Sequence, residues 1–186
     1  MRPDRSAYLE RRGERWAVVS KPGRYGPISS KRRAQLAARA LGDFCGDDLE
    51  AALPPLHAKL KRLARDLRFE DAARVRDRVR ALEQVASRVS ELDRLRSSRL
   101  CVLAPARESG FQRAFLVSHG RAHERALPLG AAGRMELESG LAIAASAEVS
   151  YAPEDAAALL VVATALRHPA PELRILPLDG AVTMAA

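Results

Sequence analysis

The strongest periodic pattern in this chain of 186 residues lies in residues 53–95, which read LPPLHAKLKRLARDLRFEDAARVRDRVRALEQVASRVSELDRL. The first part repeats leucine at spacings of three and four, the period of one helix face, at Leu53, Leu56, Leu60, Leu63 and Leu67. A second apolar stripe of the same period follows, at Ala72, Val75, Val79, Leu82, Val85, Val89, Leu92 and Leu95. Few residues separate the two stripes, so we predict antiparallel helices joined by a tight turn.

The limits of this helical hairpin can also be placed. The first helix should begin near Pro55, because a proline in the first turn loses no helical hydrogen bond. The second stripe is longer than the first, so Val85, Val89 and Leu92 need cover from another part of the chain.

The residues before the hairpin are typical of a small β-hairpin and a helix. Strand-like runs at residues 7–9 and 16–19 flank a turn at Arg12 and Gly13. Two Pro/Gly steps then break the chain, and Ser29 or Ser30 can cap a helix over residues 31–41 that Gly42 ends.

The residues after the hairpin favour a small antiparallel sheet with helices. Three strands are expected, at residues 100–103, 111–117 and 121–127. A helix should open at residues 153–155 and end near His168, a last strand is expected within 173–176, and residues 130–150 give no assignment. The fold class is therefore α+β, with a basic module at 1–42, the helical hairpin at 49–97 and an α+β module at 99–186.

Positive charge is concentrated at the N-terminal end. Residues 1–41 hold 11 basic and 3 acidic side chains, and this excess equals the net charge of +8 of the whole chain. We expect this end to hold the DNA backbone without reading bases, with contacts from Arg11, Arg12, Arg24, Tyr25, Lys31, Arg32 and Arg33. The alternative is a cationic surface that serves only solubility.

Several classes of protein are disfavoured. No apolar run reaches the roughly 18 residues of a membrane span, and no apolar core follows the charged N-terminus, so we expect a cytoplasmic protein. The two cysteines, Cys45 and Cys101, give no disulfide framework. His119 and His123 have a helical ligand spacing but lie in a predicted strand, so we expect no metal and no cofactor. No catalytic residues can be assigned.

The turn of the hairpin is the strongest candidate for a binding site. Phe69 lies where two helices cannot fully bury it, and Ala73 leaves room for another backbone. With Glu70, Arg76 and Asp77 nearby, this pattern suits a small protein-binding hot spot. The alternative is that Phe69 plugs the open end of the hairpin, while the charges form solvated pairs such as Glu70 with Arg74.

The same run resembles a known motif. Residues 69–82 read FEDAARVRDRVRAL, and with Leu60, Ala64 and Leu67 upstream they resemble the UVR motif of the UvrB and UvrC subunits of the bacterial excinuclease. Leu60 replaces a usual methionine and Leu63 a usual small residue. In that family the hairpin joins UvrB to UvrC and also self-associates. The resemblance therefore implies a UvrB-type partner, or a homodimer, at Phe69, Glu70, Ala73, Arg76 and Asp77.

The flanks extend this resemblance. Residues 8–30 are similar to the stretch that follows the GIY-YIG nuclease core in UvrC, and residues 100–127 to the strands after its UVR hairpin. The residues of the GIY-YIG and ribonuclease-H-like nuclease centres are not found. The resemblance thus implies a non-catalytic UvrC-like protein or fragment of nucleotide excision repair, similar to the exonuclease–UvrC fusions of high-GC bacteria.

Two alternatives stay open. UVR-like hairpins also occur in adaptors that regulate arginine kinases and Clp proteases, without a DNA role. Those adaptors usually carry Cys-x-x-Cys zinc pairs, which this sequence lacks, and Cys45 alone cannot hold a metal. The other alternative is a cryptic nuclease whose acidic residues do not align with those of UvrC.

Overall fold

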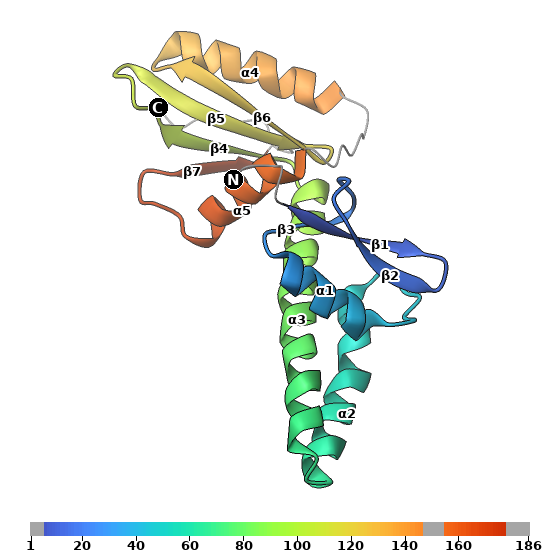
Figure 1. Cartoon of the computed structure of the whole chain (residues 1–186). Helices are drawn as coiled ribbons and strands as arrows, with labels where there is room; N and C mark the ends of the chain where they lie inside the picture. Colours follow the sequence, from blue (N-terminus) through green and yellow to red (C-terminus); the bar gives the residue numbers. More distant parts are fainter. Residues whose placement is uncertain (1–5, 147–154, 178–186) are drawn as a thin grey trace. The chain divides into compact units, whose positions relative to one another are not determined.

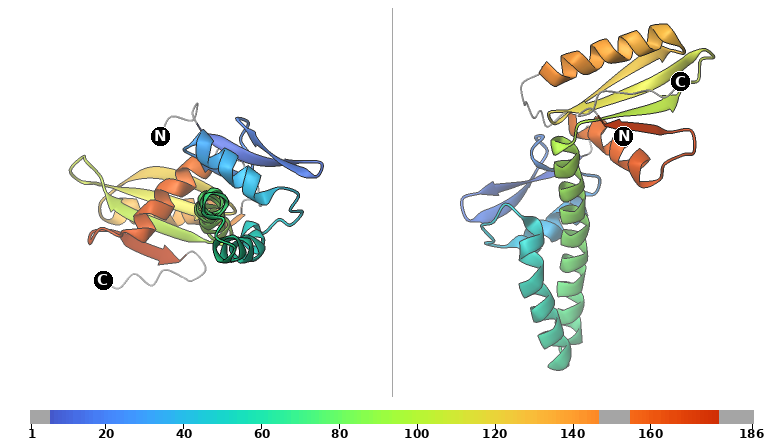
Figure 2. Two further views of the ribbon diagram at one scale, coloured as in Figure 1. Left: turned by 60° about the horizontal axis from the view of Figure 1, so that its bottom comes forward. Right: turned by 180° about the vertical axis from the view of Figure 1, so that it is seen from behind.

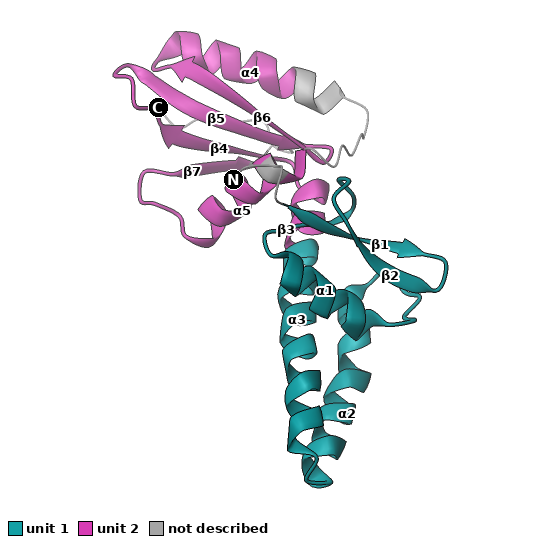
Figure 3. Cartoon of the chain, viewed as in Figure 1, with its two compact units in different colours: residues 1–90 teal, residues 91–186 magenta. Residues whose placement is uncertain are grey.

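The computed structural model describes residues 6–146 and 155–177 and has an α+β fold (Figure 1). It divides into two compact units, residues 1–90 and 91–186 (Figure 3). Helix α3 begins in the first unit and ends in the second, and each unit is described by itself below.

The first unit contains a small sheet followed by helices, and its elements in chain order are β1 (Ala7–Arg12), β2 (Arg15–Val19), β3 (Tyr25–Ile28), α1 (Lys31–Leu41), the 3-10 turn η2 (Leu49–Ala52), α2 (Leu53–Arg65) and the greater part of α3 (Phe69–Ser97). The sheet is antiparallel, with the order β2-β1-β3. The second unit contains the end of α3, and then β4 (Leu100–Pro105), β5 (Phe111–Ser118), β6 (Arg121–Pro128), α4 (Ala131–Ser146), α5 (Ala156–Arg167) and β7 (Arg174–Pro177).

The predicted β-hairpin is confirmed. Arg12 pairs with Arg15 across a two-residue turn, and Gly13 has a φ of +62°, which favours glycine. Strand β3 was not predicted, because its Gly-Pro step resembles a break. Gly26 fits there because an added Cβ would lie 2.5 Å from the ring of Tyr8.

Helix α1 also forms as predicted, and Ser30 is the residue that caps it. The Ser30 hydroxyl accepts a hydrogen bond from the Arg33 amide at 3.3 Å, and Gly42 ends the helix with a φ of +55°. The buried face of α1 consists mostly of alanines, so the helix can approach its neighbours closely. The core around it includes Leu9, Trp16, Ile28, Ala34, Ala37, Leu82, Val85 and Val89. The predicted cover for Val85 and Val89 therefore comes from the N-terminal module.

The second unit is a four-stranded antiparallel sheet of order β6-β5-β4-β7 with a helix on each face (Figures 1 and 2). The predicted three-strand meander is confirmed, and β7 adds the expected last strand beside β4. Helix α5 is confirmed over 156–167, while Pro153 and Glu154 of its expected start lie outside the described residues. Helix α4 occupies part of the stretch that gave no assignment.

Alternating side chains along β4 cover the two faces of this sheet. Cys101 and Leu103 pack toward Leu137 of α4, whereas Val102 packs with Leu159 of α5 and with Leu92 from the end of α3. The predicted cover for Leu92 is therefore provided within the second unit.

Candidate protein-interaction site at the tip of the helical hairpin

Helices α2 and α3 form the predicted antiparallel pair (Figures 1 and 2). The two helices contact each other through an apolar cluster. Its buried members are Leu63, Ala72, Val75 and Val79, and its partly buried members are Leu53, Leu56 and Leu60. Helix α2 begins at Leu53, two residues before Pro55, so Pro54 and Pro55 lie in its first turn as predicted. The described cluster agrees with both predicted stripes except at Leu67.

Leu67 does not continue the leucine stripe, and that prediction is wrong. Helix α2 ends at Arg65, and the amides of Leu67 and Arg68 bond back to the carbonyls of Ala64 and Leu63 at 3.2 and 2.9 Å. This is a Schellman motif, and it places Leu67 in the left-handed conformation with a φ of +57°. The side chain is turned out of the helix pair and is 71% exposed.

Phe69 is exposed as well. It is the first residue of α3 and is 65% exposed, so it does not seal the end of the hairpin. Leu67 and Phe69 together form what we call the apolar tip. Exposed apolar surface at the end of a hairpin is a candidate for an interaction site.

The other predicted partner-binding residues follow the apolar tip along α3. Residues 72, 75 and 79 face α2, and at 100° per residue positions 69, 73 and 76 lie about 90° around α3 from them, on one flank of the contact with α2. Ala73 is half-buried, while Glu70, Arg76 and Asp77 are exposed. Arg76 contacts Asp77 at 3.5 Å. We call this surface the outer face of α3, and partner binding there stays a prediction.

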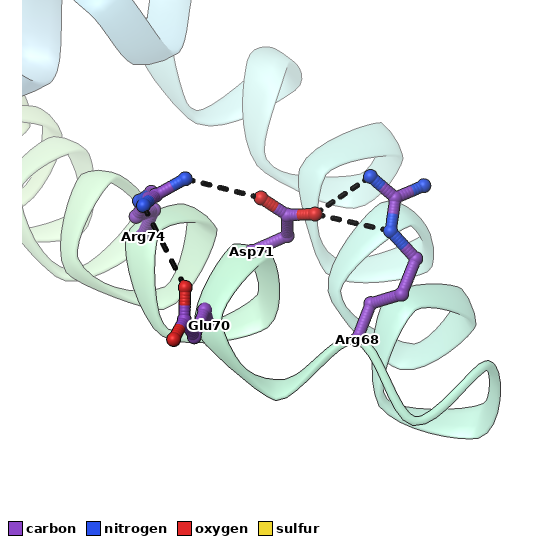
Figure 4. Close-up of polar contacts among 4 residues, drawn as sticks. All are labelled: Arg68, Glu70, Asp71 and Arg74. Carbon is purple, nitrogen blue, oxygen red and sulfur yellow. Dashed lines mark hydrogen bonds and ion pairs between the residues drawn. The ribbon is translucent and has the colours of Figure 1, made fainter.

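A charged network fixes the turn (Figure 4). Arg68 donates to one oxygen of Asp71 at 2.6 and 3.0 Å, and Arg74 donates to the other at 3.3 Å. The hydrogen bond from Arg68, together with its charge, holds the pKa of Asp71 below its ordinary value. Glu70 and Arg74 form the predicted i,i+4 pair at 3.8 Å. Both acids lie in the first turn of α3, where the helix dipole favours them.

Several predicted DNA-binding residues already have contacts within the chain. Arg11 donates to the carbonyl and the Sγ atom of Cys45, both at 3.0 Å, and Arg12 pairs with Glu10 at 3.0 Å. Tyr25 is half-buried and its hydroxyl donates to Asp47. The guanidinium of Arg24 lies 5.5 Å from the centroid of the Tyr25 ring. These contacts order the surface and leave DNA binding by it a prediction.

Lys31, Arg32 and Arg33 are exposed at the start of α1, and none has a side-chain partner among the described residues. Arg32 and Arg33 line a pocket of about 310 Å³ together with Asp77 and Arg80 of α3. Sequence reasoning did not select Arg80, because only the tertiary contact of α1 with α3 brings it beside the other arginines.

The remaining candidate groups form no visible site. Within residues 6–146 and 155–177, no group of three or more His, Cys, Asp and Glu residues could hold a metal ion. His119 lies 3.2 Å from a nitrogen of Arg99. Burial raises the pKa of Cys101 to about 11, so this thiol stays protonated at neutral pH.

Comparison with known proteins identifies the hairpin. The family model of the UvrB/uvrC motif, UVR, matches residues 51–85. These residues cover α2, the turn and the first half of α3, and they include the apolar tip. No curated protein and no solved structure is significantly similar to the chain. The predicted UVR motif is thus confirmed, and it indicates an interaction with another protein.

A membrane-spanning helix is not found in the part of the chain that the structure describes, since no helix there is both long and apolar enough.

Proposed function

We propose that this protein is a non-catalytic, UvrC-like DNA-repair protein that binds a UvrB-type partner through its UVR hairpin and DNA through its basic N-terminal module. The observation that carries the proposal is the apolar tip. Leu67 and Phe69 are exposed at the end of a hairpin that matches the UVR motif.

The energetics of the apolar tip favour a protein partner. Each of these side chains is about two-thirds exposed, so its complete removal from water by a partner would contribute about 1–2 kcal/mol. Backbone hydrogen bonds close the turn and the Arg68–Asp71–Arg74 network spans it, so the apolar tip is already ordered before a partner binds. Charges on the outer face of α3, such as Arg76 and Asp77, would then orient the partner helix. A second copy of this hairpin could cover the apolar tip in the same way and form a homodimer.

The DNA part of the proposal is supported by the cations in the first turn of α1, which are unpaired among the residues that the structure describes. Lys31, Arg32 and Arg33 are three consecutive exposed residues in the first turn of α1, so they concentrate positive charge at a helix N-terminus, where a phosphate backbone can bind. Contacts of this kind position DNA without selecting a sequence.

The substitution Phe69→Ala tests the partner site. We expect it to weaken the capture of a UvrB-type UVR hairpin by about 2 kcal/mol or more, because an exposed aromatic anchor would be lost. Binding of the purified hairpin to the full chain can be measured by calorimetry, with helicity followed by circular dichroism. The matched control is Phe111→Ala, which removes a 41% exposed aromatic ring from the second unit and should leave binding unchanged.

Equal binding by the Phe69→Ala variant and the unaltered protein would contradict the partner site. Capture of the hairpin without any DNA binding would instead support the adaptor role, in which a UVR protein regulates a kinase or a Clp protease.

A further inference from the structure

A cationic groove runs between α2 and α3 beside the turn. It has a volume of about 400 Å³. Five basic residues line it, namely Lys59, Arg62, Arg68, Arg74 and Arg78. Two acidic residues, Asp66 and Asp71, also line it, and the two apolar residues of its wall, Leu63 and Val75, are buried.

The basic residues are only partly neutralised. Asp71 is held by Arg68 and Arg74, and its ionised form is favoured there. The side chains of Arg62 and Arg78 have no hydrogen bond or ion pair among the residues that the structure describes, and Lys59 interacts with Asp71 only through its charge. Lys59 and Arg62 are three residues apart on α2, and Arg74 and Arg78 are four apart on α3. Each helix therefore lines one side of the groove with two cations one turn apart.

The composition of the groove favours a polyanion over a folded protein surface. The centres of protein–protein interfaces are poor in charged residues, whereas interfaces with nucleic acid are strongly positive. Here the exposed lining is charged throughout, and the large exposed apolar groups, Leu67 and Phe69, do not line it. Arginine also matches the geometry of a phosphate with two parallel hydrogen bonds.

We propose that this groove binds the phosphodiester backbone of a nucleic acid and is a second nucleic-acid surface, separate from the cations in the first turn of α1. At 100° per residue, positions 71, 74 and 78 lie on roughly the opposite side of α3 from positions 69, 73 and 76. One hairpin can therefore hold a protein on the outer face of α3 and a phosphate backbone in the groove at the same time.

The double variant R62Q/R78Q tests the groove. It is compared in the full chain with R107Q/R134Q, which removes the same charge from exposed arginines of the second unit. Fluorescence anisotropy of a short labelled duplex of mixed sequence, and of an RNA strand of the same sequence, gives the affinity between about 50 and 200 mM salt. The urea midpoint and the helicity of each variant are measured first, as a check of folding.

For R62Q/R78Q we expect an affinity about tenfold lower near 100 mM salt, and a salt slope less steep by about 1.8, which is 0.9 for each of two phosphate contacts. R107Q/R134Q should match the unaltered protein. An unchanged affinity and slope for R62Q/R78Q would overturn the inference, and so would binding of polyglutamate without binding of either nucleic acid.

A third variant, R32Q/R33Q, separates this inference from the proposed function. If only R32Q/R33Q loses affinity, nucleic-acid binding by the groove is contradicted and the proposed N-terminal DNA site is supported. If only R62Q/R78Q loses affinity, nucleic-acid binding by the groove is supported and the proposed N-terminal DNA site is contradicted.

Discussion

Asp71 is the acid that joins the two arginines of the charged network at the turn. It receives hydrogen bonds from Arg68, which lies in the turn, and from Arg74, one helical turn further on. An acid at this point of α3 also interacts favourably with the positive end of the helix dipole. The sequence allowed the Glu70–Arg74 pair to be predicted from its spacing, but not this network. Arg68 precedes the helix, so its direction depends on how α2 ends.

The lowered pKa of Asp71 predicts a pH-dependent contribution to stability. A carboxyl group with a depressed pKa in the folded state stabilises the fold above its unfolded pKa of about 3.9, and this contribution is lost as the pH falls through the folded pKa. Asp71→Asn should therefore lower the urea midpoint at pH 7, and the difference from the unaltered protein should shrink below about pH 4. Asp43→Asn, at an exposed aspartate, is the control. A difference that persists undiminished at pH 3 would contradict the ion-pair explanation.

Among the elements, the end of α2 is unusual because a leucine occupies the left-handed position of its Schellman motif. Glycine is the common residue there, since a side chain in this conformation costs about 1–2 kcal/mol. Leu67 gains little in return from packing, because most of it is exposed. A strained and exposed leucine beside Phe69 is consistent with selection for binding at the expense of stability.

The substitution Leu67→Gly tests whether Leu67 lowers the stability of the fold while it strengthens binding. We expect the free energy of unfolding to rise by up to about 1 kcal/mol, because the strain at φ +57° is removed. Capture of a UVR hairpin should become weaker, because half of the apolar tip is lost. Leu129→Gly is a suitable control, since Leu129 is also exposed but is not among the residues with positive φ, and it should not stabilise the fold. A Leu67→Gly protein that is less stable, or that binds equally well, would contradict the explanation.

Helix α4 explains why one element could not be assigned from the sequence. Within residues 131–142, the part of α4 whose side chains the structure describes, the buried positions are Gly133, Leu137 and Gly140, which follow a helical spacing but include only one large apolar residue. A Cβ added at Gly133 would lie 1.8 Å from the carbonyl oxygen of Pro128, so this residue must be glycine for the helix to approach β6. A search for apolar periodicity misses a helix that packs through its smallest residues.

For the whole molecule, local patterns were sufficient for the fold class and for the UVR motif. The leucine and valine stripes predicted the helical hairpin, and the alternation after residue 100 predicted the meander. The tertiary arrangement could not be read in this way. Arg80 lies beside Arg32 and Arg33 only because α1 packs on α3. The groove likewise collects cations from both helices of the hairpin.

The central claim is that the tip of the hairpin binds a UVR-type partner. Hydrogen–deuterium exchange of the full chain, with and without a saturating UvrB-type UVR hairpin, tests it most directly. We predict that exchange slows within residues 63–80, which include the apolar tip and the outer face of α3, and that the second unit is unaffected. No protection in these residues, or protection confined to the second unit, would contradict the claim.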